Sequence, residues 1–157
     1  MIYSKKEISQ KCQRWRAKSQ KIVFTNGCFD LLHRGHIDLI TKCAEFGDIL
    51  IVGLNSDKSI KRLKGSHRPI ENEKTRARNL LKLNIISGLC IFDNDTPLEL
   101  IKVIRPYILA KGGDYDYGQI IGSSEVIKEG GMIKIVPLLP GYSTTLSIEK
   151  MKREGLV

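Results

Sequence analysis

Short apolar runs rich in β-branched residues alternate with amphipathic segments along this chain, and this alternation most constrains its fold. The apolar runs lie at residues 21–25, 49–54, 89–92, 107–110 and 132–136. Segments with helical periodicity or helix-start signals separate them, at residues 35–47, 73–86, 97–104 and 123–128. Strands that alternate with helices of these lengths predict βα units and a parallel sheet covered on both faces. We therefore expect one doubly wound α/β domain.

Both ends of the chain carry further helix signals. Ser4, with Glu7 three residues later, forms a capping-box pair for a helix that runs to about residue 20. A last helix is expected over residues 144–153. We expect the first twenty residues to form a helix docked on a core of residues 21–157, with no second domain.

Composition and charge narrow the class of protein. No apolar run approaches the roughly 20 residues that span a bilayer, and the N-terminus lacks an apolar signal core, so we expect a cytoplasmic protein without a membrane partner. The four cysteines form no C-x-x-C pair, which argues against a disulfide framework and a zinc site. The net charge of +9 attracts anions. Because the basic residues are scattered and no nucleic-acid-binding signature is present, we expect no nucleic-acid partner.

Two histidines follow the first predicted strand in the motif His33-Arg34-Gly35-His36. At a helix start, this spacing lets both imidazoles point the same way, and Gly35 lets a phosphate approach the backbone. The free N–H groups of the helix N-terminus favour an anion there. Such a site can stabilise a phosphate whose charge grows in a transition state. The motif alone also fits an incomplete metal site or two structural histidines that cap the helix.

Beyond this motif, the chain resembles the nucleotidyltransferase superfamily marked by H-x-G-H, a superfamily of Rossmann-like domains. Within it, the chain is most similar to the bacterial heptose 1-phosphate adenylyltransferases of lipopolysaccharide core biosynthesis. The resemblance is carried by segments in family order: Phe24 to His36; Leu54 to Asp57, with Lys61 to Gly65 and Arg68-Pro69; Asp95 to Pro97, with Lys111 to Tyr115; and Ser143 to Thr145. It therefore covers nearly the whole chain and predicts a single nucleotidyltransferase domain over residues 1–157.

The resemblance implies a reaction in which ATP and D-glycero-D-manno-heptose 1-phosphate give ADP-heptose and pyrophosphate. It implies Mg²⁺ as a companion of ATP, although the sequence contains no side-chain cluster for a metal. The implied partners are these two small molecules and, by analogy with relatives, a second copy of the chain.

The resemblance also assigns the site residues, with His33 and His36 as the catalytic pair that holds the ATP phosphates. Ser143 to Thr145, before the last helix, are expected to cradle the β- and γ-phosphates, although this segment alone also fits an ordinary N-cap. The residues expected to bind ATP are Thr25, Asn26, Gly27, Cys28, Phe29, Gly35, Lys111, Gly112, Asp114, Ser143, Thr144 and Thr145.

Four further polar residues are candidates for substrate contacts. Lys64 and Arg76 are expected to bind phosphate, although Lys64 also fits a solvated surface position. Asp30 and Asn55 follow predicted strands, and we expect them to face sugar or ribose hydroxyls or a bound Mg²⁺. The chain departs from the family at Ser87, where relatives usually carry an acidic residue, and over residues 71–75. Neither departure lies in the predicted phosphate cradle.

Two other functions compete with this interpretation. A cytidylyltransferase acting on glycerol 3-phosphate or a similar alcohol phosphate would share His33, His36 and residues 143–145. The segments 26–28 and 111–115 favour the heptose enzyme. The second alternative is a non-catalytic protein that binds anions or nucleic acid on the same fold. The intact histidine pair and the scattered basic charge argue against it.

Overall fold

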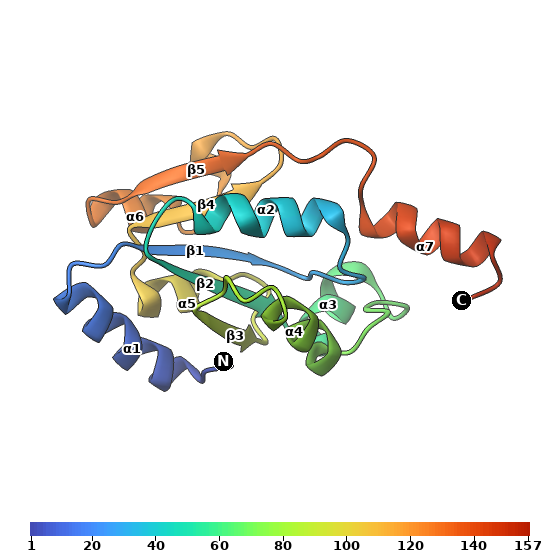
Figure 1. The fold of residues 1–157 in the computed structure, drawn as a ribbon, viewed down its shortest axis with the longest axis horizontal. Coiled ribbons are helices and arrows are strands. Elements are labelled where there is room, and N and C mark those ends of the chain that lie inside the picture. The colour runs from blue at the N-terminus through green and yellow to red at the C-terminus, as the bar shows by residue number, and fades with distance from the viewer.

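A five-stranded, entirely parallel sheet forms the centre of the computed structural model, which describes residues 1–157 (Figure 1). The strand order is β3-β2-β1-β4-β5. The strands are β1 (Ile22–Gly27), β2 (Ile49–Asn55), β3 (Gly88–Phe92), β4 (Ile108–Gly112) and β5 (Met132–Val136). The chain moves outward from β1 to β3 and then returns to add β4 on the other side of β1. This reversal confirms the predicted doubly wound fold.

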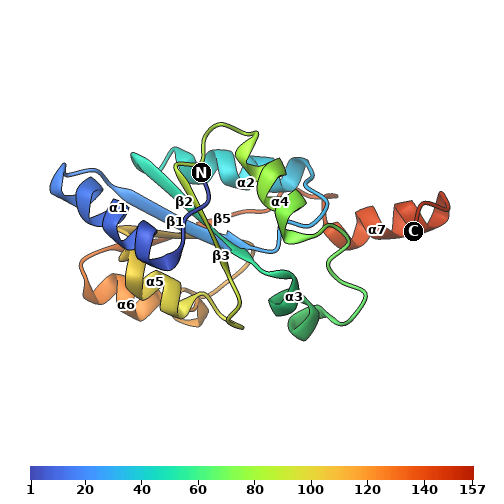
Figure 2. The same cartoon turned by 90° about the horizontal axis from the view of Figure 1, so that it is seen from below.

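Helices cover both faces of the sheet (Figure 2). One face is covered by α1 (Lys5–Ala17), α5 (Leu98–Ile104) and α6 (Ser123–Lys128), and the other by α2 (Arg34–Ala44) and α4 (Glu73–Leu81). The other helices are α3 (Asp57–Lys64), the short 3-10 helix η1 (Tyr117–Gln119) and α7 (Thr144–Arg153). Helix α7 extends away from the sheet and contains no buried residue (Figure 1). None of the helices has the length and apolar character that crossing a membrane requires.

Two apolar clusters, one on each face of the sheet, form the core. Successive residues of β1 alternate between them: Val23 belongs to the cluster under α2 and α4, and Phe24 to the cluster under α1 and α5. Neighbouring positions on β2 do the same, with Leu50 and Ile51 on opposite faces. Because a central parallel strand is buried on both faces, these strands have continuous apolar sequences rather than alternating ones.

Three predicted helices end earlier than their sequence patterns suggest, and the first, α1, ends at Ala17 instead of about residue 20. Helix α2 ends at Ala44 instead of residue 47, and Gly47 packs so closely against the chain before β1 that a Cβ there would lie 2.8 Å from the Lys21 carbonyl oxygen. Helix α4 ends at Leu81 instead of residue 86, and Asn84 adopts a left-handed conformation with φ of 56°. Leu83 and Ile86 still pack against the core cluster, so the apolar pattern continues beyond the helix.

The N-terminal helix is docked on the sheet as predicted. Its capping box is present: Ser4 Oγ accepts a hydrogen bond from the Glu7 amide, and the Glu7 carboxylate accepts one from the Ser4 amide. Only Ile8 and Cys12 of this helix are buried, and partly buried Trp15 packs against the same cluster. Attachment of α1 therefore depends on few apolar contacts.

We predict that Ile8→Ala will lower the free energy of unfolding by about 2–5 kcal/mol, because it leaves a cavity between α1 and the sheet. Denaturant unfolding monitored through Trp15 measures the change. Ile2→Ala is the control, since Ile2 is half exposed, and it should cost less than about 1 kcal/mol. An equal loss in the two variants would contradict the assignment of Ile8 as the anchor of α1.

Candidate active site

The reversal of strand order between β1 and β4 determines where a ligand can bind. In doubly wound sheets, the crevice at such a switch point, beyond the carboxyl ends of the strands, is the usual ligand site. A pocket of about 160 Å³ occupies this position. It is lined by Asn26, Gly27, Cys28, Phe29, His36, Leu39, Lys64, Lys111, Gly112 and Thr144.

The pocket brings together residues that the sequence predicted from four separate segments. Every lining residue except Leu39 was a predicted site residue. Leu39 lies three positions after His36 on α2, and this helical spacing is the signal that could have identified it. Thr25 is fully buried and Asp114 is exposed, and neither lines the pocket.

His33 and His36 form a reciprocal cap at the start of α2. His33 is the N-cap residue, and its Nδ1 accepts hydrogen bonds from the amides of Gly35 at 3.1 Å and His36 at 3.4 Å. In return, His36 Nδ1 accepts a hydrogen bond from the His33 amide at 3.3 Å. The two rings stack with centroids 3.7 Å apart. The histidines thus cap the helix, one of the three interpretations of the motif, while His36 also lines the pocket.

This cap determines which nitrogen of each ring carries the proton. A neutral imidazole has one donor and one acceptor nitrogen. Because Nδ1 is the acceptor in both His33 and His36, the hydrogen-bond pattern assigns the proton to Nε2 in each ring. His33 Nε2 is buried without a hydrogen-bond partner. The pair therefore carries N–H donors of the kind that bind an anion, and of the two residues His36 lines the pocket whereas His33 does not.

Both imidazoles are neutral at pH 7. Burial, together with the neighbouring His33 ring, lowers the pKa of His36 to about 4. Burial also lowers the pKa of His33. Neutral Nε2–H groups can bind phosphate oxygens without a proton transfer in either direction.

Gly35 allows the neighbouring segments to approach this cap. A Cβ at this position would lie 2.9 Å from His33 Cε1 and 3.0 Å from Tyr142 Cβ. The Tyr142 ring lies nearly parallel to that of His33, with centroids 6.3 Å apart. A side chain at residue 35 would therefore separate the histidines from the segment that precedes α7. Sequence analysis had not assigned Tyr142 to the site.

The segment before α7 contributes only part of its predicted cradle. Thr144 lines the pocket, and its hydroxyl donates a hydrogen bond to the Asp30 carbonyl oxygen at 2.9 Å. Ser143 Oγ is the N-cap of α7 and accepts a hydrogen bond from the Leu146 amide. Neither Ser143 nor Thr145 lines the pocket. The helix cap and the pocket contact are thus made by adjacent residues.

Lys111 and Gly112, at the end of β4, form the opposite wall. Burial lowers the pKa of Lys111, and the positive charge of Lys64 contributes to the same effect. A Cβ at Gly112 would lie 2.9 Å from Leu138 and 3.0 Å from Leu39, so only glycine fits there without displacing these side chains. The two lysines give the pocket a positive charge.

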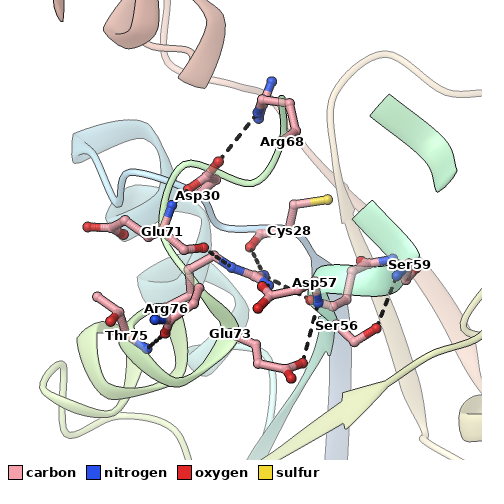
Figure 3. A network of polar contacts seen from close by, with 12 residues as sticks. Cys28, Asp30, Ser56, Asp57, Ser59, Arg68, Glu71, Glu73, Thr75 and Arg76 are labelled. Carbon is pink, nitrogen blue, oxygen red and sulfur yellow. Dashed lines mark hydrogen bonds and ion pairs between the residues drawn. The ribbon is translucent and has the colours of Figure 1, made fainter. Parts of the chain in front are cut away.

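The predicted phosphate role of Arg76 is corrected by its contacts (Figure 3). The guanidinium is fully buried and donates to the carbonyl oxygens of Cys28, Asn55 and Glu71 at 2.7–3.0 Å. It also donates to the Asp57 carboxylate at 2.9 Å. These protein acceptors occupy the group, and Arg76 does not line the pocket.

The roles predicted for Asp30 and Asn55 are corrected in the same way. Asp30 is fully buried, and its carboxylate accepts hydrogen bonds from the amides of Ile70 and Glu71 rather than facing the pocket. Asn55 is buried at the end of β2, and its side-chain amide donates to Ser59 Oγ. Both side chains are thus occupied by protein contacts.

The site offers no side-chain cluster for a metal ion. No three His, Cys, Asp or Glu residues gather into a possible metal site, and no carboxylate lines the pocket. The one carboxylate of the histidine loop, Asp30, is occupied by backbone amides. The residues present therefore do not fit a protein-held metal.

Two solved structures have a similar architecture. A lipopolysaccharide core biosynthesis protein from Thermoplasma volcanium is 26% identical, with a TM-score of 0.62 over 76% of this chain and 97% of that chain. A pantoate-beta-alanine ligase from Francisella tularensis, solved with beta-gamma ATP and beta-alanine, has a TM-score of 0.63 over 99% of this chain and 83% of that chain. The latter is 16% identical, so it shows similarity of fold alone.

Sequence comparison places the chain in a family. Residues 24–150 match the family described as Cytidylyltransferase-like, and the chain belongs to that family. It is 48% identical to the bifunctional protein HldE of Koribacter versatilis over 95% of this chain and 31% of that protein. It is 53% identical to the bifunctional protein HldE of Hyphomonas neptunium over 88% of this chain and 28% of that protein. The chain thus spans less than a third of the length of these two relatives.

The histidine cap generates a prediction about pH. Because folding lowers the pKa of His36 from 6.5 to about 4, the unfolded chain binds a proton more readily between these values. The free energy of unfolding should therefore decrease as the pH falls from about 6.5 to about 4. Urea unfolding across this range measures the decrease, and His36→Asn should reduce its slope. NMR titration with a His36 midpoint near 6.5 would contradict the assignment.

Proposed function

We propose that the chain transfers an adenylyl group from ATP to D-glycero-D-manno-heptose 1-phosphate, giving ADP-heptose and pyrophosphate. The proposal is carried by the stacked pair of neutral imidazoles at a helix N-terminus beside the switch-point pocket. Membership of the Cytidylyltransferase-like family supports nucleotidyl transfer. Two observations support heptose 1-phosphate as the acceptor: the sequence identity of 48% and 53% with the two HldE proteins, and the similarity to the Thermoplasma protein of lipopolysaccharide core biosynthesis.

In the proposed reaction, an oxygen of the heptose 1-phosphate attacks the α-phosphorus of ATP in line. A new P–O bond forms, the bond between the α-phosphorus and the bridging oxygen breaks, and pyrophosphate leaves with that electron pair. Little covalent chemistry falls to the protein, so catalysis is positioning and charge stabilisation. His33 and His36 donate from Nε2 to phosphate oxygens, and the N-terminus of α2 adds its dipole.

The remaining pocket residues orient the nucleotide in this proposal. The N-terminus of α7 at Thr144 takes the β- and γ-phosphates, and Lys64 and Lys111 balance their charge. Asn26 to Phe29, with Gly112, form the walls beside the nucleoside. Mg²⁺ enters with ATP as part of the substrate, since the pocket presents no carboxylate to hold it. A reaction that consumes ATP fits the expected cytoplasmic location.

A cytidylyltransferase that acts on an alcohol phosphate is the second candidate, and the description of the matched family favours it. It would use the same histidine pair, so the two reactions differ only in the nucleobase of the triphosphate and in the acceptor. The test incubates the protein and Mg²⁺ with each nucleoside triphosphate and a panel of sugar and polyol phosphates. Pyrophosphate release is measured for every pair. Turnover with ATP and heptose 1-phosphate is expected, and turnover with CTP alone would refute the adenylyl assignment.

We predict that His36→Ala will lower kcat by about 10²–10³-fold, because it removes one hydrogen-bond donor to the reacting phosphate. Steady-state pyrophosphate release under saturating ATP measures the change. The matched control is His67→Ala, which removes an exposed imidazole from the loop after α3 and should leave kcat unchanged. Full activity in His36→Ala would exclude the proposed mechanism, whichever substrate is used.

A further inference from the structure

The segment between β1 and the histidine cap contains two residues in strained backbone conformations. Phe29 and Leu31 have φ values of 47° and 50°, in the left-handed region that L-residues avoid. Such conformations persist where surrounding contacts hold them, and they cluster at functional sites. The contacts that hold this segment are made at Cys28 and Asp30, the residues on either side of Phe29.

The first contact is the carboxylate of Asp30. Its Oδ2 accepts a hydrogen bond from the Ile70 amide at 2.7 Å, and its Oδ1 accepts one from the Glu71 amide at 2.9 Å. Arg68 lies beside it, with Nε 3.4 Å from Oδ2 (Figure 3). The main-chain oxygen of Asp30 accepts the hydrogen bond from Thr144. One fully buried residue therefore joins the histidine loop, the loop after α3 and the start of α7.

The second contact is made by the guanidinium of Arg76, on α4, with Cys28, which lies two residues before Asp30. It binds the carbonyl oxygen of Cys28 at 2.7 Å and, with the same Nη1, that of Asn55 at 2.8 Å. Its Nη2 binds the carboxylate of Asp57, the first residue of α3 (Figure 3). Arg76 thus ties the histidine loop to the end of β2 and the start of α3.

These two contacts enclose Phe29, which lies directly against the catalytic pair. Phe29 is 4% exposed, and its ring meets the His36 ring edge-on, with centroids 5.4 Å apart. Fixing Cys28 on one side and Asp30 on the other fixes the position of this ring. The ring in turn limits where the His36 imidazole can lie.

We propose that Asp30 and Arg76 are positioning residues that act as a buried clasp, setting the His33–His36 pair through Phe29 without touching substrate. The inference rests on the proposed function, because it assigns these residues a task in the transfer reaction. The chemistry of the Asp30 carboxylate and of the Arg76 guanidinium suits the contacts that each group makes. The two backbone amides of Ile70 and Glu71 each need an acceptor oxygen, and the planar arginine fork reaches separated acceptors that the compact lysine ammonium cannot all reach.

The test compares Asp30→Asn and Arg76→Lys with matched controls. Asparagine places an NH₂ group against one of the two amides, and lysine loses the fork, so both variants release one side of Phe29. We expect kcat to fall by about 10²-fold, because small misplacements of catalytic groups have effects of this size. The KM for ATP should change by less than about threefold, since the lost donors act mainly in the transition state. A merely structural role would lower the folded fraction without this split.

The controls are Asp38→Asn, which removes a surface ion pair with Lys42 on α2, and Arg78→Lys at an exposed position of α4. Both should retain wild-type kcat. If Asp30→Asn does not fold, Phe29→Leu keeps an apolar side chain but removes the ring contact with His36, and it should lower kcat by at least about tenfold. A wild-type kcat per folded molecule in the clasp variants or in Phe29→Leu would overturn the proposal.

A second readout separates this inference from the proposed function. In ¹⁵N NMR spectra, the imidazole nitrogens of His33 and His36 should show Nε2–H tautomers in the wild type and altered shifts in Asp30→Asn. If the wild type transfers no adenylyl group to heptose 1-phosphate, the proposed function fails, but this spectroscopic comparison still decides on the clasp. Unchanged imidazole shifts in a folded Asp30→Asn would refute the positioning role.

Discussion

The site depends on the reciprocal hydrogen bonds by which His33 and His36 cap helix α2. The first amides of a helix have no partner within it, and side chains must satisfy them. Here two imidazoles do so through Nδ1, which leaves Nε2 of each ring as the donor. One edge of each ring therefore caps the helix, and the proposed contact with phosphate uses the opposite edge. Loss of either histidine removes a helix cap and, in the proposed reaction, a phosphate contact as well.

Much of the fold was predictable because its signals are local. Apolar runs, capping residues and their alternation predicted all five strands, most of the helices and the doubly wound topology. The ends of α2 and α4 were not predictable from helical periodicity. The close packing at Gly47 and the core contact of Leu83 depend on tertiary structure. The pocket followed from topology, since predicted loops at strand ends converge at the switch point. Its missed member, Leu39, is an apolar residue that resembles core in the sequence.

The candidate residues with the least predictable positions were the charged ones. Asp30 lies in a segment that carries the family resemblance and Arg76 lies outside those segments, but both were expected to face a ligand. Their partners are mainly backbone groups of distant segments, as between Arg76 and Cys28, 48 residues apart. Backbone acceptors have no residue-type signature, so no sequence pattern reveals such a pairing. The structure distinguishes charges that meet solvent or ligand, such as Lys64, from those that organise the loops.

The strand order also has a consequence for how the protein folds. Strand β1 pairs with β4, with Val23 opposite Ile108, so the two sides of the crevice come from distant parts of the chain. The third wall of the crevice, at Thr144, comes from a part of the chain that lies beyond β4 in the sequence. Contacts of such long sequence separation close large loops, and they form late in folding relative to local helices. We therefore expect the crevice to be among the last parts of the molecule to form, so that a ligand that fills it would bind only the fully folded chain.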